Sequence, residues 1–134
     1  MQHRMLSKED EARTDEVEVR REDQDKINKF SRLHHKEMSL EEELKSRIKE
    51  KEDLEDVSNE LELADEDEKI PYKIGDSFIS LHVPEVQELL ETSTIKIKEQ
   101  VNQLEEKLSQ IRTEMSELKV DLYARFGPSI NLET

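Results

Sequence analysis

Apolar residues recur every seven positions between Pro84 and Phe126. The first row is Leu90, Ile97, Leu104, Ile111 and Leu118, and the interleaved second row is Thr94, Val101, Leu108, Met115 and Leu122. Alternating steps of four and three place both rows on one face of a helix, as in a coiled coil. Pro84 suits the start of a helix, and Gly127-Pro128 suits its end. The pattern predicts a coiled-coil helix over 83–127, whose apolar stripe needs a partner helix.

The preceding segment carries a weaker apolar row. Leu33, Leu40, Leu54 and Leu61 share one heptad lattice, Arg47 takes the missing position, and nearby lie Ile27, Phe30, Leu44, Ile48 and Val57. We therefore predict a first helix over 23–68. In an antiparallel pair the rows superimpose, with Leu61 facing Leu90, Leu54 facing Ile97, Leu40 facing Ile111 and Leu33 facing Leu118. This matching register favours a hairpin within one chain over a parallel dimer.

Residues 69–82 change to a period of two around the Gly75-Asp76 turn, which is typical of a β-hairpin. In that register Ile74 pairs with Ser77, Tyr72 with Ile79 and Ile70 with Leu81. One face then carries Ile70, Tyr72, Ile74, Ile79 and Leu81, whereas the other carries Phe78 among polar residues and Pro71. A lone two-stranded hairpin is marginal in water. Because the helices are already paired, we expect the same hairpin of other chains to cover it, and hence an oligomer.

The expected fold is mainly α, a long antiparallel coiled-coil helical hairpin with one short β-hairpin between the helices. Residues 1–22 show no sustained period and are expected to be disordered in isolation. Residues 128–134 form a C-terminal tail. Composition agrees, because the 134 residues are 42% charged and only 32% hydrophobic, which excludes a thick globular core. Few glycines and prolines favour helices over low-complexity disorder.

The net charge of −14 is concentrated in residues 50–68, which hold eleven acids and one lysine. This acidic collar has two interpretations, a solvated, self-repelling surface or a docking surface for a basic patch on a partner. The acidic balance argues against nucleic acid or an anionic membrane as the main partner. Residues 1–22 lack the apolar stretch of a secretory signal, and no segment approaches the length of a membrane span.

No pattern in the sequence indicates catalysis, a cofactor or a metal. The chain has no cysteine, and Gly75 and Gly127 alone cannot form a phosphate-binding loop. His34 and His35 are adjacent, so on a helix they point about 100° apart and cannot share an ion. The acidic run 65–68 lacks the glycine and spaced glutamate of a calcium loop. We therefore expect no catalytic, cofactor-binding or metal-binding residues, and no enzyme.

Apolar side chains gather where the two termini are expected to meet. They are Ile27, Phe30, Leu122, Tyr123, Phe126, Ile130 and Leu132. Two interpretations stand at this point. The group closes the last heptad as a small cap, or it contacts a ligand, since an apolar group that exceeds its packing need forms a binding surface.

Three stretches together resemble beta-type prefoldin subunits. They are Glu22-Asp-Gln-Asp-Lys-Ile-Asn-Lys-Phe30, Ile70-Pro-Tyr-Lys-Ile-Gly-Asp-Ser-Phe-Ile79 and Leu122-Tyr-Ala-Arg-Phe-Gly-Pro-Ser-Ile-Asn-Leu-Glu133. The order and spacing of the three stretches match those of the family, and the last stretch is the most specific. The single hairpin turn between the helices matches the beta type. The departures are Pro128, the His34-His35 pair and a divergent first 20 or so residues.

The resemblance implies a cytoplasmic heterohexamer with a β-barrel platform from which coiled coils extend. It implies ATP-independent capture of unfolded proteins such as actin and tubulin, and their transfer to the cytosolic group II chaperonin. The residues implied for subunit assembly are Ile70, Tyr72, Ile74, Phe78, Ile79 and Leu81, and the apolar tip residues named above are implied for client contact. Two alternatives remain, a structural coiled-coil tether or scaffold without client binding, and an acidic chaperone of histones or nucleic acid.

Overall fold

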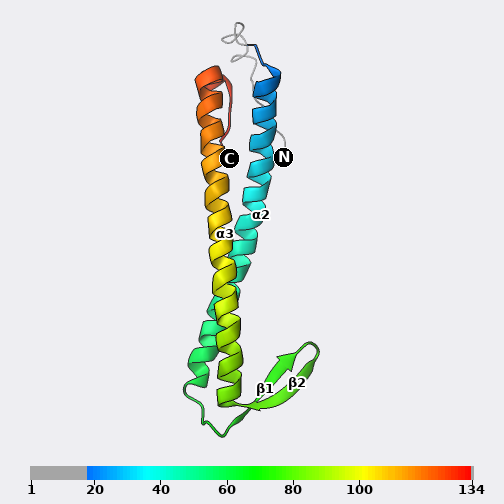
Figure 1. The fold of residues 1–134 in the computed structure, drawn as a ribbon, viewed down its shortest axis with the longest axis vertical. Helices are drawn as coiled ribbons and strands as arrows, with labels where there is room; N and C mark the ends of the chain where they lie inside the picture. Colours follow the sequence, from blue (N-terminus) through cyan, green and yellow to red (C-terminus); the bar gives the residue numbers. More distant parts are fainter. Residues whose placement is uncertain (1–17, 134) are drawn as a thin grey trace. The chain divides into compact units, whose positions relative to one another are not determined.

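The computed structural model describes residues 18–133, so most of the segment expected to be disordered lies outside the described residues. The elements are, in order, α2 (Arg21–Leu61), β1 (Lys69–Ile74), β2 (Ser77–His82), α3 (Val83–Phe126) and the short 3₁₀-helix η1 (Gly127–Ser129). Figure 1 labels the two long helices and the two strands. The expected fold is confirmed. It is mainly helical, with two long helices and one antiparallel β-hairpin between them.

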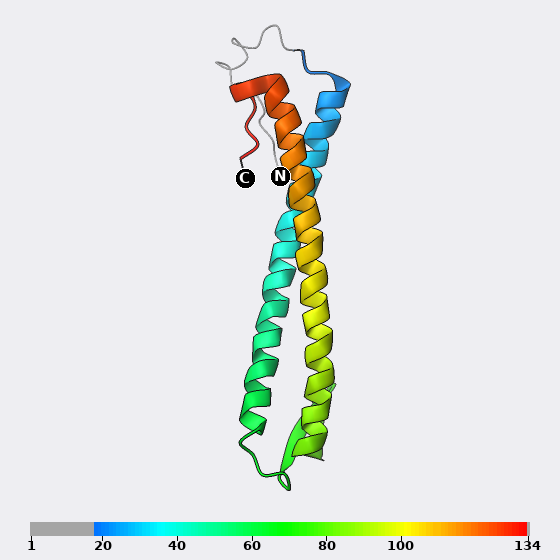
Figure 2. The same ribbon diagram turned by 60° about the vertical axis from the view of Figure 1, so that its left-hand side comes forward.

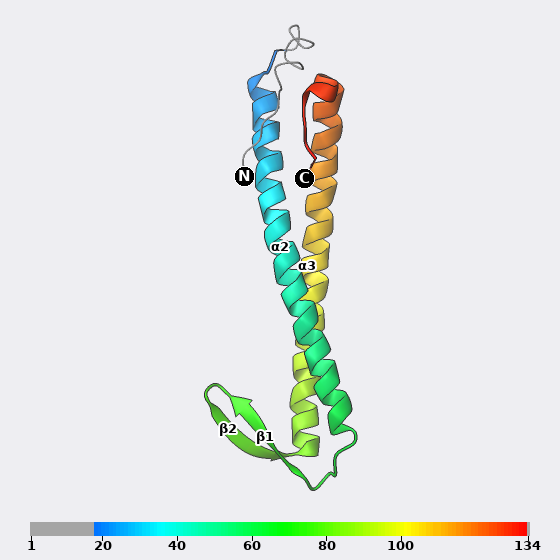
Figure 3. The same cartoon turned by 180° about the vertical axis from the view of Figure 1, so that it is seen from behind.

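The chain divides into two compact units, and both long helices contribute to each. The terminal unit consists of residues 18–42 and 106–133 within the described part of the chain, and the hairpin unit consists of residues 43–105. In each unit a segment of α2 lies antiparallel to a segment of α3, which is clear from the front and from behind (Figure 3).

The heptad stripe on α3 is buried as its pattern predicts. All nine apolar residues of the two rows are buried, and Thr94 is half-buried. The helix begins at Val83, so Pro84 occupies its second position. Glu85, in the first turn, accepts a hydrogen bond from the backbone N–H of His82 (3.2 Å) and so satisfies a donor that the helix leaves unpaired. At the other end Gly127 has φ +57°, a conformation that commonly terminates helices.

The matching stripe on α2 is thinner. Leu40 and Leu61 are buried, whereas the remaining members of the leucine row are half-buried and Val57 is exposed. A second heptad row on this helix, which we call the half-polar row, has three polar members among five. It consists of Phe30, Glu37, Leu44, Lys51 and Ser58, of which only Phe30 is buried. The core of each unit is therefore supplied mainly by α3, and α2 covers it with a mixture of leucines and the aliphatic parts of polar side chains.

The first helix ends at Leu61, although the sequence pattern extends it to residue 68. Backbone N–H groups of residues 63 and 64 bond to carbonyls three residues earlier, and the chain then continues through separate turns. The last turn of α2, which lies wholly within the described residues, contains no basic side chain. Five acidic residues, Glu62, Asp65, Glu66, Asp67 and Glu68, follow the negative end of the helix dipole, which disfavours further helix. Leu63 is 91% exposed and so gives no packing that would extend the helix.

The β-hairpin has the predicted register. Ile70 pairs with Leu81, Tyr72 with Ile79 and Ile74 with Ser77. Gly75 occupies the first central position of the turn with φ +60°, the position at which a type II′ turn requires glycine. The alternation of side chains across the two strands is therefore the one that the sequence indicates.

One expectation about the hairpin needs correction. Ile70, Tyr72 and Leu81 pack against a cluster formed by Leu61, Val86 and Leu90 of the same chain. The helices are thus available to cover one end of the hairpin, because α2 stops at Leu61 and leaves the first turns of α3 accessible. The cover that we expected from other chains is therefore needed only at the other end of the hairpin, near the Gly75-Asp76 turn, which we call its far end.

Candidate functional site

The far end of the hairpin is an exposed apolar surface. Phe78 is 66% exposed, Ile74 is 55% exposed and Ile79 is 43% exposed, although all three have large side chains. The described residues form one sheet of only two strands, so each strand keeps one edge without a β-partner. Exposed apolar side chains beside open strand edges favour pairing with another chain. Of the six residues implied for assembly, these three are accessible, and the other three anchor the hairpin to the helices.

The second candidate surface is the tip, where the terminal unit closes. All seven apolar residues singled out in the sequence lie in this unit. Six of them are buried, and Tyr123 is half-buried: the six are Ile27, Phe30, Leu122, Phe126, Ile130 and Leu132. The tip as it stands is thus a closed cap. Contact between a ligand and these side chains requires the cap to open.

The C-terminal tail completes this cap. After Gly127 the chain makes one 3₁₀ turn, and Ile130 then adopts an extended conformation (φ −115°, ψ 139°). The tail turns back along α3, as Figure 2 shows. The backbone N–H of Leu132 donates to Tyr123 Oη (3.3 Å), which lies 3.4 Å from the Glu133 carboxylate. Tyr123 therefore holds the end of the tail through its hydroxyl group.

Closure of the tail involves two opposing contributions to the free energy. Burying Ile130 and Leu132 contributes about 1.5–3 kcal/mol for each side chain. Fixing the backbone of residues 130–133 costs about 1–2 kcal/mol for each residue. The two contributions are of similar size, so burial of these two side chains alone does not hold the tail firmly closed.

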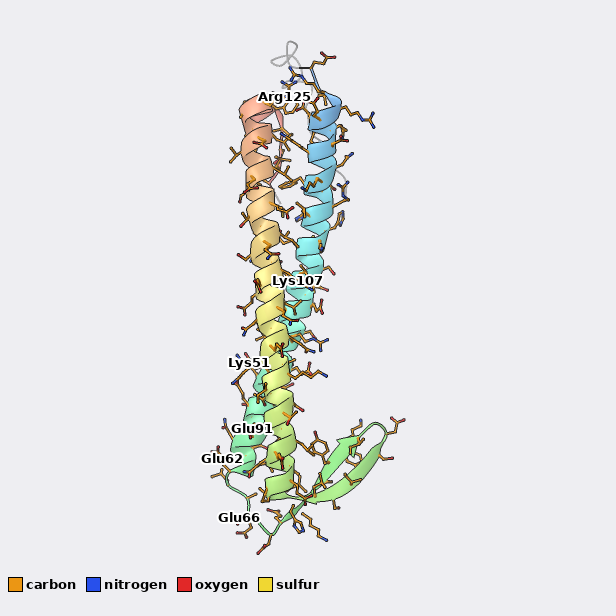
Figure 4. The ribbon with its side chains drawn as sticks, viewed as in Figure 1. Lys51, Glu62, Glu66, Glu91, Lys107 and Arg125 are labelled. Carbon is orange, nitrogen blue, oxygen red and sulfur yellow. The ribbon has the colours of Figure 1, made fainter. Side chains whose placement is uncertain are left out.

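A partly buried ion pair ties the start of α2 to the end of α3. Arg125 donates from Nε to Asp23 Oδ2 (2.6 Å) and from Nη2 to the Glu18 carbonyl. Asp23 also accepts from the backbone N–H of Arg20 (2.9 Å), which caps the helix. The Arg125 guanidinium lies 5.5 Å from the centre of the Phe126 ring. Figure 4 shows Arg125 at this end of the terminal unit.

The protonation of Asp23 follows from these contacts. Burial alone raises the pKa of its carboxyl group. The hydrogen bonds from Arg125 and from the Arg20 backbone, together with the two positive charges, outweigh burial and hold the pKa below its ordinary value. The carboxylate is therefore charged at neutral pH, and the pair acts as a clamp. We call Asp23 and Arg125 the tip clamp.

Weaker ion pairs continue along the terminal unit. Lys26 lies 3.3 Å from Asp121, and Lys29 lies 3.7 Å from Glu114. Arg112 bonds to both Glu37 and Glu41, and these hydrogen bonds raise its pKa. Exposed pairs of this kind contribute about 0–1 kcal/mol each. Their chief effect is on register, because they join residues of α2 and α3 in the antiparallel order that the apolar rows predict.

The described residues contain no arrangement that suggests a metal site. Within residues 18–133, no group of three or more His, Cys, Asp or Glu side chains is placed to hold an ion. His34 Nδ1 is buried and lies 3.6 Å from Glu37, and the His34 and His35 ring centres are 6.3 Å apart. The acidic residues 65–68 are all exposed. No helix in the described part of the chain is both long and apolar enough to cross a membrane.

The tip clamp and the half-polar row on α2 were not predicted from the sequence. One signal for the clamp was present, because Asp23 lies in the first helical turn and Arg125 in the last turn of the other helix, each at its favoured end of a helix dipole. Glu37 and Lys51 gave no such signal. A search for apolar residues passes over polar side chains that occupy heptad positions.

Comparison with known proteins agrees with the resemblance noted in the sequence. The family model described as "Prefoldin subunit" matches residues 24–129. Prefoldin subunit 4 of Homo sapiens is 43% identical over 123 residues, covering 91% of this chain and 92% of the relative. Prefoldin subunit 4 of Saccharomyces cerevisiae is 43% identical over 117 residues, covering 87% and 91%.

A solved structure supports the fold. The prefoldin beta subunit from Thermococcus strain KS-1 superimposes with a TM-score of 0.76, covering 84% of this chain and 98% of the archaeal chain, at 12% identity. Prefoldin is a family of chaperones that are not enzymes. The family match over most of the chain, the curated relatives and the shared fold together lead to one conclusion: the chain belongs to the prefoldin subunit family, as a co-chaperone subunit.

Proposed function

We propose that this chain is the beta-type subunit 4 of a cytoplasmic, heterohexameric prefoldin. In this proposal the hexamer captures unfolded proteins such as actin and tubulin at the coiled-coil tips, without ATP, and transfers them to the cytosolic chaperonin. The observation that carries the proposal is the exposed far end of the β-hairpin, which leaves three large apolar side chains beside open strand edges. The identity to relatives named Prefoldin subunit 4 supports the choice of subunit.

The hairpin residues divide into two roles in assembly. Ile70, Tyr72 and Leu81 pack on the helices of the chain and fix the direction of the hairpin. The exposed side chains of Ile74, Phe78 and Ile79 then contact the neighbouring subunits. The direct contacts come from the second group, and the first group acts by positioning.

Assembly is tested with Phe78→Asp, which places a charge on the most exposed aromatic of the hairpin. The variant is mixed with the other five subunits, and the complexes are weighed by native mass spectrometry. We expect incomplete hexamers, because a carboxylate must then be desolvated at the subunit contact. Val120→Asp is the matched control, because Val120 is equally exposed but lies on α3 in the terminal unit. Complete hexamers with Phe78→Asp would contradict the platform role.

Client capture at the tip rests on the apolar residues that the closed cap buries. Several tips on one platform bind one unfolded chain through contacts that are individually weak. Because the tips are linked, each further contact forms at a high effective concentration, and the complex with the unfolded chain is stable. The test is suppression of actin aggregation, followed by light scattering, with hexamers that contain Phe126→Ser. We expect several-fold weaker suppression than with hexamers that contain Val120→Ser. Transfer is measured separately, as movement of labelled actin from the hexamer to purified chaperonin without ATP.

A structural tether is the second candidate function, and one observation favours it. Because six of the seven tip residues are buried, the tip can simply terminate the two helices and bind nothing. The two functions differ in the aggregation assay. Equal suppression by Phe126→Ser and Val120→Ser hexamers of normal mass would favour the tether for this subunit and remove client contact from its tip.

A further inference from the structure

The C-terminal residues 129–133 have the properties of a bound peptide. Ile130 and Leu132 are 4% and 1% exposed, whereas Asn131 between them is exposed. In an extended segment residues two positions apart point to the same side. The tail thus presents two apolar side chains toward the rest of the terminal unit, and it returns along α3 after the turn at Gly127 (Figure 2). We call residues 129–133 the strap.

Few polar contacts hold the strap. The Leu132 N–H group donates to Tyr123 Oη, and the same hydroxyl group meets the Glu133 carboxylate. The Asn131 side chain bonds to the backbone N–H of Glu133, which is a contact within the strap itself. Recognition of this kind depends on two apolar side chains and one hydrogen bond to the peptide backbone. It depends on this spacing of apolar residues and not on their identity.

One buried group opposes closure. Ser129 is 2% exposed, and within residues 18–133 its Oγ atom has no hydrogen-bond partner. A buried hydroxyl group without a partner is destabilising because it has lost its bonds to water. The strap therefore closes with one unfavourable contact.

We propose that the strap is an internal ligand of the tip. When it leaves, the apolar surface that it covered binds an extended segment of another polypeptide, with apolar side chains two positions apart. The strap itself is the template for that ligand, since it shows which pattern the surface accepts. This inference rests on the proposed capture of clients at the tip and specifies both the ligand class and a competition that limits binding.

The experiment compares three hexamers that differ only in this subunit. Ile130→Ser combined with Leu132→Ser releases the strap, Ser129→Ala removes the unpaired hydroxyl group and holds the strap closed, and Val120→Ser is the control at an exposed site. The probe is a fluorescent peptide with the sequence of residues 127–134, and a peptide with serine in place of both apolar residues controls for specificity. Fluorescence anisotropy gives the dissociation constants.

The expected order follows from the fraction of tips that are open, because the apparent dissociation constant rises as that fraction falls. The released hexamer should bind the peptide at least about tenfold more tightly than the control if the strap is closed about nine-tenths of the time. The Ser129→Ala hexamer should bind several-fold more weakly than the control. The doubly substituted peptide should not bind. A truncation after Pro128 provides a second released variant and should match the first.

Two results would overturn the proposal. Either equal peptide affinity in all hexamers or no binding by both released variants would show that the strap covers no peptide site. Actin capture, measured on the same hexamers, separates this proposal from the proposed function. Peptide binding in the expected order without actin capture retains the strap and rejects client capture. Actin capture that is the same in every hexamer, without peptide binding, retains client capture and rejects the strap as an internal ligand.

Discussion

Replacing Arg125 with alanine should loosen the tip without affecting the hairpin unit. The Asp23 side chain is only 7% exposed, and the substitution leaves its carboxylate with the Arg20 backbone N–H as its remaining partner among the contacts described. Removing one member of a fully buried pair costs about 3–5 kcal/mol. Arg125 is itself partly exposed, at 27%, so we expect a loss of about 2–3 kcal/mol.

Hydrogen exchange followed by mass spectrometry is the suitable assay, because it reports each unit separately. A loss of this size accelerates exchange of backbone amides at residues 24–30 by roughly 30- to 150-fold, if they exchange through local opening of the tip. Amides at residues 50–58, in the hairpin unit, should exchange at unchanged rates. The comparison within one molecule removes differences in protein concentration and solvent.

The matched control is Lys26→Ala, which removes the exposed ion pair with Asp121 one helical turn from the clamp. Exposed pairs contribute about 0–1 kcal/mol, so exchange at residues 24–30 should accelerate by less than about fivefold. Arg125→Lys keeps the positive charge but loses the second donor and should fall between the two. Equal acceleration by Arg125→Ala and Lys26→Ala would refute the reasoning that burial of Asp23 makes this pair strong.

Three further predictions concern pH, the core and the seam between the helices. The pKa of Asp23 is lowered in the folded state, so the stability that its carboxylate gives the tip is complete at pH values above the ordinary pKa of 3.8 and is lost as the pH falls through the lower pKa of the folded protein. Hydrogen exchange at residues 24–30 should accelerate over that pH range, and Asp23→Asn should abolish this pH-dependent acceleration. Leu90→Ala removes a buried side chain from the hairpin cluster and should cost about 2–5 kcal/mol in urea unfolding followed by circular dichroism; a loss below about 1 kcal/mol would contradict its core position. Arg47→Leu supplies the missing apolar heptad residue and should raise the free energy of unfolding by about 1 kcal/mol, because the exposed ion pair with Glu50 that it removes contributes little. A lower melting temperature would show that the ion pair stabilises the chain more than an apolar residue does.

The sequence predicted the parts of the fold that depend on periodicity. The rows on α3 and the alternation in the hairpin each specify a face, and burial follows that face closely. The end of α2 was predicted too late, because heptad spacing says nothing about the charge that follows a helix. The acidic residues after Leu61 oppose the helix dipole, and a charge-based rule would have found that boundary.

The candidate sites were predicted as lists of residues, but their exposure was not. A sequence pattern identifies Phe126 and Leu132 as apolar and places them near each other, yet burial depends on where the tail turns after Gly127. Similarly, it identifies Ile70 and Phe78 as hairpin residues, but only the packing on α3 shows that one is anchored and the other exposed. Exposure is a property of tertiary arrangement, and a local pattern does not contain it.

The charged residues at heptad positions of α2 have a consequence for how the chain is made. A ribosome adds about 5–20 residues per second, so several seconds pass between the synthesis of α2 and the completion of α3. During that time two nascent copies of α2 that pair in parallel would place Lys51 against Lys51 and Arg47 against Arg47, which like charges oppose. The richer stripe on α3 emerges only when its partner is already present. The charged residues in the seam of α2 therefore disfavour a parallel pairing of this helix with a second copy of itself.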